Sequence, residues 1–358
     1  MTAVLCKDKV QTKPFGGKAL AIERSQMFPE TTKRSGSGWV TTMSRFWRNA
    51  RRSRVGVVFL VLFPQTRVLG QEQSPNVVHV DVNLVLLDAT VKTKAGRIMG
   101  DLKQEDFEVR EDGVPQKIDI FSRDELPLNV ALVLDLSDSI GPFLGPLRQA
   151  ASSALAALKP EDEVALFTFS TEAELRVPFT NDKTRIAQEI SGFHVGGATN
   201  INDGIFVAAK YLLNTPPKGR RVIILISDDV GTSAGGQGTH DIVTECTAAD
   251  VALYNLKIPG YNPPGTLFAA SMVPGLVNIH KVLDQTGGEL FDVQDVAHLD
   301  AAFRALIDRI KTRYTLGYYT QASAAEGKPH KLDVRLASSF GKKGHEYVIL
   351  SKSGYYVH

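Results

Sequence analysis

The segment LNVALVLDLSDS, residues 128–139, joins an apolar run to a cluster of carboxylate and hydroxyl side chains. The run at 130–134 is continuous rather than alternating, which is typical of a strand that is covered on both faces, as in a parallel sheet. Similar runs occupy 164–167, 222–226 and 251–254. The sequence therefore predicts several buried, parallel strands.

Helical patterns separate these strands. They cover 147–158, 201–213 and 241–249. The clearest helical pattern is the last, where one apolar stripe is formed by Leu299, Phe303, Leu306, Ile307 and Ile310. Alternation of strand and helix predicts an α/β fold, a doubly wound, mainly parallel sheet of the Rossmann-like kind over residues 128–312.

Short β segments flank this domain on both sides. In the first, at 71–127, apolar residues at even positions from 78 to 86 alternate with polar ones, which predicts a strand with one solvent-facing side. The pair Asp112-Gly113 predicts a hairpin, whose loop we expect Val114-Pro115 to lengthen. The second segment, 313–358, has strand patterns at 314–319, 331–336 and 347–350. Because isolated sheet edges are unfavourable, we expect the two segments to pack as one β-sandwich-like module.

The N-terminal region carries an export signal. Four arginines at 48–54 precede the apolar run 55–63, and small residues follow near Gly70. We interpret 43–70 as a signal peptide, because the run is too short to span a bilayer. Residues 1–42 have no sustained periodicity and are interpreted as an upstream or disordered segment, with translation starting at Met43 or Met27. The mature chain is therefore expected to be secreted, periplasmic or at the cell surface, without a membrane span.

Charge argues against nucleic acid as a partner. Of the 41 Lys and Arg and 39 Asp and Glu residues, the first 70 positions hold 13 and 3, which leaves a body of 28 basic and 36 acidic residues with a net charge of −8. Phosphate neutralisation needs a positive surface. The body offers none by composition.

Oxygen-bearing side chains follow the ends of the predicted strands. Asp135, Ser137 and Ser139 follow the strand at 130–134, and Asp228 follows the strand at 222–226. Thr199 lies in the glycine-rich segment before the helix at 201–213. The carboxyl ends of the strands are where open α/β sheets bind ligands. Two carboxylates and three hydroxyls without sulfur or imidazole favour a hard divalent cation, Mg²⁺ or Ca²⁺, with Mn²⁺ as a further candidate. Helix capping by the same side chains is compatible with this site.

These five residues, in this order, resemble the metal-ion-dependent adhesion site of the von Willebrand factor A domain. The resemblance covers about 128–312 and implies that the serines and the threonine contact the metal, that the aspartates often act through water, and that a partner's Glu or Asp completes the shell. Asp229 departs from the family, in which many members have Gly, and is expected either to favour Ca²⁺ or to point into solvent.

The flanking segments extend the resemblance. The motif DFEVREDGVPQ at 106–116, with YTLGY at 314–318 and GYY at 354–356, is similar to an exported bacterial group of von Willebrand factor A-related proteins, best known from acidobacteria. No P-loop or HExxH motif is present. We therefore expect an adhesion or protein-interaction module rather than an enzyme. The alternatives are an assembly or scaffold subunit that serves an enzyme complex, or a structural envelope protein with an empty metal site.

Overall fold

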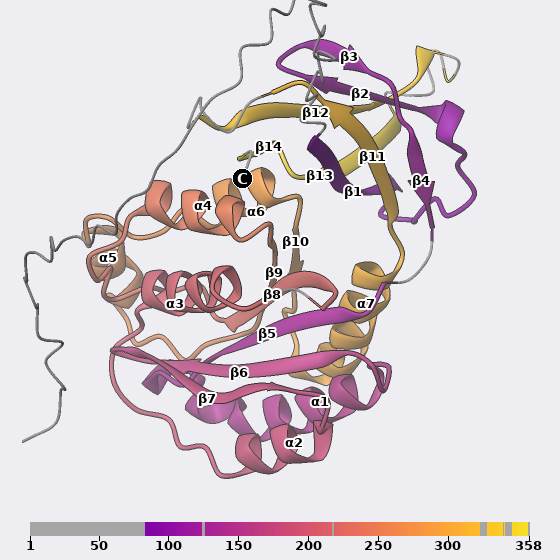
Figure 1. Ribbon diagram of the computed structural model, residues 1–358. Helices are drawn as coiled ribbons and strands as arrows, with labels where there is room; N and C mark the ends of the chain where they lie inside the picture. The colour runs from indigo at the N-terminus through magenta and orange to yellow at the C-terminus, as the bar shows by residue number, and fades with distance from the viewer. Residues whose placement is uncertain are drawn as a thin grey trace, which may run out of the picture. The chain divides into compact units, whose positions relative to one another are not determined.

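A computed structural model describes residues 83–123, 126–216, 218–322, 328–338, 340 and 346–356. Within these residues, six strands form a sheet in the order β10-β9-β8-β5-β6-β7 (Figure 1). All neighbours are parallel except the β6–β7 pair, which is antiparallel. The predicted α/β fold with a mainly parallel sheet is confirmed.

The strands of this sheet are β5 (Leu128–Asp135), β6 (Glu163–Phe169), β7 (Ala173–Thr180), β8 (Arg220–Ser227), β9 (Ala252–Lys257) and β10 (Glu289–Asp292). The helices are α1 (Leu144–Ala156), α2 (Lys183–Ser191), α3 (Ile201–Leu213), α4 (Thr239–Ala248), α5 (Thr266–Ser271), α6 (Ile279–Thr286) and α7 (Leu299–Lys311). Short 3-10 helices occupy Gln104–Asp106, Asp138–Phe143 and Val296–His298. In the part of the chain that the structure describes, no helix is both long and apolar enough to cross a membrane.

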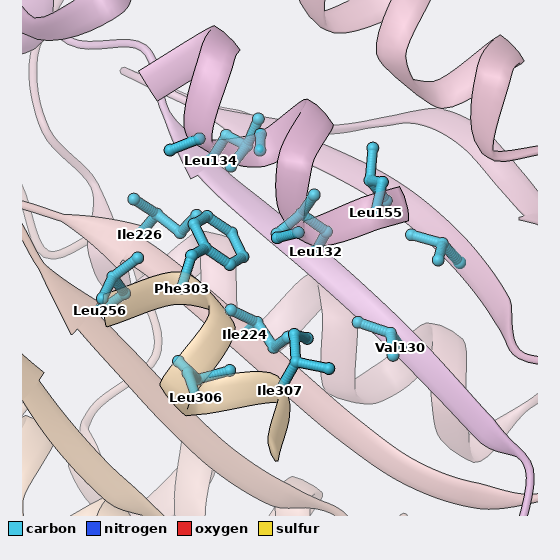
Figure 2. Packing of buried hydrophobic residues seen from close by; sticks show 14 of the residues in the cluster. Val130, Leu132, Leu134, Leu155, Ile224, Ile226, Leu256, Phe303, Leu306 and Ile307 are labelled. Atoms are coloured by element: carbon cyan, nitrogen blue, oxygen red, sulfur yellow. The ribbon is translucent and has the colours of Figure 1, made fainter. Parts of the chain in front are cut away.

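Both faces of the sheet are covered by helices. On β5, Val130, Leu132 and Leu134 pack with α1, α2 and α7, whereas Ala131 and Val133 pack with α3, α4 and α6. Figure 2 shows the first of these layers, in which α7 lies against β5, β8 and β9. The buried residues of α7 are the five of the predicted stripe. This double coverage explains why the strands are apolar at consecutive positions.

Two further sheets combine strands from before and after the α/β domain. Their orders are β13-β1-β11-β4 and β14-β12-β2-β3. The strands are β1 (Asn83–Thr93), β2 (Phe107–Glu111), β3 (Val114–Gln116), β4 (Ile120–Ser122), β11 (Tyr314–Thr320), β12 (His330–Leu336), β13 (Tyr347–Ser351) and β14 (Gly354–Tyr355). Each sheet therefore pairs the two flanking segments, and a third apolar core fills the module. The predicted β-sandwich-like module is confirmed, while the domain boundaries themselves stay predictions.

Two details of this module differ from the prediction. The buried side of β1 consists of the odd positions Val85, Leu87, Ala89 and Val91, whereas Leu84 is 43% exposed. The pattern at 78–86 suggested the even positions, and residues 78–82 lie outside the described part. The strand runs on to Thr93, and over that length only the odd positions supply an unbroken apolar side to face the core.

The hairpin of β2 and β3 is tighter than expected. Glu111 pairs with Val114, so the loop is only the two residues Asp112 and Gly113. Both have positive φ, 48° and 86°, as a two-residue turn of this type requires. Pro115 lies within β3, where it is tolerated because β3 is an edge strand. The predicted signal peptide at 43–70 and the segment 1–42 lie outside the described residues.

Candidate metal centre

Asp135 is the last residue of β5 and is completely buried. Its Oδ1 atom accepts a hydrogen bond from the backbone N–H of Ser137 at 2.8 Å. Its Oδ2 atom accepts one from the hydroxyl of Ser227, at the end of the neighbouring strand β8, at 2.6 Å. The carboxylate is therefore fixed from both sides at the carboxyl edge of the sheet.

The two serines lie together beside this carboxylate. The Oγ atoms of Ser137 and Ser139 are 3.2 Å apart. Ser137 precedes the 3-10 helix that starts at Asp138, and this tight turn brings the two hydroxyls to the same side. The backbone carbonyl of Ser139 accepts a hydrogen bond from the N–H of Tyr261 at 2.8 Å, which ties the turn to the segment before α5.

Thr199 and Asp228 come from two other loops at this edge. Thr199 stands just before Asn200, the residue that caps α3, and its N–H donates to the hydroxyl of Thr232 at 2.8 Å. Asp228 follows β8, and its Oδ1 atom accepts from the N–H of Val230 at 3.0 Å. Its Oδ2 atom accepts from the side-chain amide of Asn262 at 3.1 Å.

One pocket of about 390 Å³ opens between these loops. Ser139 and Thr199 line it together with Asn262, which holds Asp228. Asp135 contacts Ser137 directly, and Ser137 contacts Ser139. The five predicted residues are thus gathered at one edge of the sheet, and their role as metal ligands stays a prediction.

Burial raises the pKa of two carboxyl groups at the site. The pKa of Asp135 is raised to about 6, mainly by burial and to a smaller extent by the charge of Asp228, against hydrogen bonds from Ser137 and Ser227. Burial likewise raises the pKa of Asp229 to about 7, while the Asn255 hydrogen bond and the charge of Lys257 oppose that rise. A cation placed among these groups would favour their charged forms.

Asp229 does not point into solvent. Its backbone has φ of 61°, in the left-handed region that glycine adopts without strain. The Oδ2 atom accepts from the side-chain amide of Asn255 at 2.8 Å. The Oδ1 atom is buried and has no hydrogen-bond partner. The expectation that Asp229 points into solvent is therefore wrong. A buried carboxylate oxygen is left without a compensating partner beside the cluster.

Asn262 and Gly260 also contribute to the site, although neither was predicted from the sequence. Both lie more than 30 positions after Asp228 in the chain, and Gly260 packs so closely that an added Cβ would come within 1.9 Å of the Asp228 Oδ2 atom. No periodicity or motif marks either residue. Only the return of the chain after β9 brings them to the site.

Comparison with known families decides the identity of this domain. Residues 130–231 match the family described as von Willebrand factor type A domain, and all five predicted site residues lie within the match. The chain contains a von Willebrand factor type A domain. Such a domain indicates an adhesion or protein-interaction module. No curated protein matches the chain.

Solved structures of other proteins match parts of this chain. A von Willebrand factor type A protein from Catenulispora acidiphila is 11% identical, with 69% of this chain and 72% of that one covered and a TM-score of 0.42. An aerotolerance-related membrane protein from Bacteroides fragilis is 18% identical over 51% of this chain and 98% of that one, with a TM-score of 0.39. Proximal thread matrix protein 1 from the mussel byssus, with a zinc-occupied MIDAS motif, is 15% identical over 56% and 50%, with a TM-score of 0.40.

The residues at the site of the A domain fit a hard divalent cation. Among the described residues, no group of three or more His, Cys, Asp or Glu side chains is arranged to hold a metal. The candidate set instead combines two carboxylates with three hydroxyls, so three of its five side chains are neutral. The buried, unpartnered Oδ1 atom of Asp229 and the raised pKa of Asp135 are the signs of uncompensated negative charge that a cation would satisfy.

Proposed function

We propose that this protein is an exported, metal-ion-dependent interaction module that binds an acidic side chain of a protein partner. The observation that carries the proposal is the pair of hydroxyls from Ser137 and Ser139, 3.2 Å apart beside buried Asp135, with Ser139 at the pocket that Thr199 also lines. Oxygen ligands of this kind suit Mg²⁺ or Ca²⁺, and Mn²⁺ has similar preferences.

Residues Asp135, Ser137, Ser139, Thr199 and Asp228 would hold the ion directly or through water. When bound, the ion supplies a position for one further anionic oxygen, because two carboxylates just balance its charge and the hydroxyls are neutral. The chain's own groups keep that position open. Asn262 and Val230 restrain Asp228, and Ser227 restrains Asp135, so neither carboxylate can turn to fill it.

Binding is proposed rather than catalysis. The polar side chains that line the pocket carry hydroxyl, amide and carboxylate groups, and no histidine of the described residues lines it. A carboxylate of a partner, once its surroundings are desolvated, would gain more from the ion than an exposed ion pair gains, which is about 0–1 kcal/mol. We place the mature protein outside the cytoplasm because of the predicted signal peptide at 43–70.

Thermal unfolding of the full chain with and without divalent cation tests the metal. Mg²⁺, Ca²⁺ or Mn²⁺ should raise the unfolding midpoint, and EDTA should reverse the rise, because a ligand that binds only the native state stabilises it by about 2.7 kcal/mol at 100 times its Kd. An unchanged midpoint with all three cations would contradict the proposal. Cell fractionation, with N-terminal sequencing of the exported form, tests the location.

A further inference from the structure

A short segment beside the metal pocket exposes an unusual amount of apolar surface. Tyr261, Leu267, Phe268 and Met272, here called the apolar rim, are 64% to 69% exposed. They lie within twelve positions of one another, on the loop before α5, on α5 itself and just after it. Single exposed apolar residues are ordinary on a protein surface, but a contiguous group indicates an interaction site.

Helix α5 exposes its large apolar side chains, which a helix that only supports the fold would bury. Its one buried residue is Ala270, while its two largest side chains, Leu267 and Phe268, face outward. A surface helix normally buries its large apolar residues and exposes polar ones. The orientation of α5 therefore leaves apolar area unpartnered in the isolated chain.

The segment carries no charge. From 258 to 278, 21 consecutive residues include no Asp, Glu, Lys, Arg or His. A charged group of a partner would find no opposite charge to pair with on this segment. The absence of basic residues also disfavours a membrane as the occupant, because interfacial helices hold lipid headgroups with Lys and Arg.

The apolar rim is continuous with the metal pocket. Tyr261 and Thr266 line the pocket, Tyr261 donates its N–H to the carbonyl of Ser139, and Asn262 donates to Asp228. Because Tyr261 belongs to both surfaces and Thr266 precedes Leu267, a partner that places a carboxylate in the pocket reaches the rim at Tyr261. The pocket favours a negatively charged group on the partner, and the rim favours uncharged apolar groups beside that charge.

We propose that the apolar rim is the docking surface for apolar side chains that flank the metal-coordinating Asp or Glu of the partner. This inference rests on the proposed function, because the carboxylate is what seats the partner. The physical role of the rim is to exclude water around the bond between carboxylate and metal, since charge interactions strengthen when solvent is removed. Interfaces concentrate their binding energy in such desolvated centres.

A random dodecapeptide library displayed on phage, selected on the immobilised full chain in Mg²⁺ and eluted with acid, tests the inference. We expect selected peptides to contain Asp or Glu next to Leu, Ile, Phe, Tyr or Trp. Their affinity should fall about tenfold or more for Phe268→Ser, the scale of a hot-spot loss. Leu175→Ser is the matched control, because Leu175 is an exposed leucine on the edge strand β7, outside the pocket lining, and this variant should bind as wild type does.

The outcomes separate this inference from the proposed function. Peptides that need Mg²⁺ but bind Phe268→Ser as well as wild type would overturn the docking surface and leave the metal site standing. Peptides that bind equally in EDTA and lose affinity only with Phe268→Ser would support the surface and contradict the metal dependence.

Two further results would also overturn the docking surface. The first is a library that yields no enriched peptide. The second is that the wild type binds phosphatidylcholine–phosphatidylglycerol vesicles rather than peptides, and that Phe268→Ser loses this vesicle binding. The rise in unfolding midpoint with Mg²⁺, measured for each variant, shows that the metal site and the fold persist in Phe268→Ser.

Discussion

The hydroxyl of Ser227 donates to the Oδ2 atom of Asp135 at 2.6 Å, and this bond ties the ends of β8 and β5 together at the site. The two strands are adjacent and parallel, with Leu134 opposite Ile226. Asp135 follows Leu134 and Ser227 follows Ile226, so the two residues lie side by side at the ends of their strands. Because the bond occupies one carboxylate oxygen and the N–H of Ser137 occupies the other, the orientation of Asp135 is set before any ligand arrives.

Replacement of Asp135 by asparagine is expected to abolish the metal response. The substitution keeps the size of the side chain and removes the charge, so Mg²⁺ should no longer raise the unfolding midpoint. In EDTA at neutral pH the variant should be no less stable than wild type, because the buried carboxylate it lacks has a raised pKa. Asp300→Asn, at a partly exposed position on α7 away from the site, is the control and should keep the full response.

Stability without metal should fall as pH rises. The carboxyls of Asp135 and Asp229 have a normal pKa of 3.8 when exposed and raised values of about 6 and about 7 in the folded protein. The folded state therefore binds more protons than the unfolded chain between these limits. The stability this confers is complete below about pH 4 and is lost as pH rises through 6 and 7, a change of up to about 7 kcal/mol at about 1.4 kcal/mol per pKa unit.

Urea unfolding in EDTA from pH 4 to pH 8 measures this change. The double variant Asp135→Asn with Asp229→Asn should lack this contribution, so the difference in unfolding free energy between wild type and variant isolates the two carboxyls. Saturating Mg²⁺ should flatten the difference. A wild type that gains stability relative to the variant with rising pH in EDTA would contradict the expected sign.

Glycine at position 229 should stabilise the metal-free protein. Asp229 has φ of 61° and buries a carboxylate oxygen without a partner, so Asp229→Gly removes both a strained backbone and a costly charge. We expect a gain of about 1–3 kcal/mol in unfolding free energy at pH 8 in EDTA. Asp250→Gly is the control for the backbone, since Asp250 also has positive φ, 50°, but its exposed carboxylate only forms a surface ion pair with Lys352, so this substitution should change stability by less than about 1 kcal/mol. Equal effects of the two substitutions would show that the buried carboxylate costs nothing.

An alanine at position 260 should weaken metal binding without removing a ligand. Its Cβ atom would lie 1.9 Å from the Oδ2 atom and 2.6 Å from the Cβ atom of Asp228, so Asp228 must move. Changes that displace a ligand in this way typically lower metal affinity by about 10- to 100-fold. Calorimetric titration with Mn²⁺ measures the loss. Gly236→Ala has open space around its new Cβ atom and should bind as wild type does.

The contact between the A domain and the β module should depend on Asp88. Its Oδ2 atom lies 2.7 Å from the Nε atom of Arg220 and 3.9 Å from the Nη1 atom of Arg313, and both arginine side chains are buried. Asp88→Asn leaves two guanidinium charges without their shared carboxylate. We expect a loss of about 2–4 kcal/mol in unfolding free energy, somewhat less than for a fully buried pair because Asp88 is partly exposed.

Asp300→Asn again provides the comparison. The ion pair of Asp300 with Arg304 on α7 is exposed, so its loss should cost less than about 1 kcal/mol. Urea unfolding measures both variants. A cost for Asp88→Asn no larger than that for Asp300→Asn would indicate that the two arginines are compensated by other groups.

Several elements of the α/β domain were predictable because their signals are local. The side chains of β5 are apolar on both of its faces, which predicts that helices cover both sides of the sheet. The five-residue stripe on α7 has helical spacing, which predicts a helix with one buried face. Asp135, Ser137 and Thr199 follow their strands or precede their helices directly. Strand ends share one edge in a parallel sheet, and the chain order alone therefore placed these residues together.

The sequence by itself determined the class of fold and the five oxygen-bearing side chains at the sheet edge, since both depend on short-range spacing. Only the tertiary structure decided which side of β1 is buried, where the carboxylate of Asp229 lies, and that Gly260 and Asn262 close around Asp228. Those features depend on which distant segments pack against one another. The free energy of that packing is shared among many residues, so no single stretch of the chain records it.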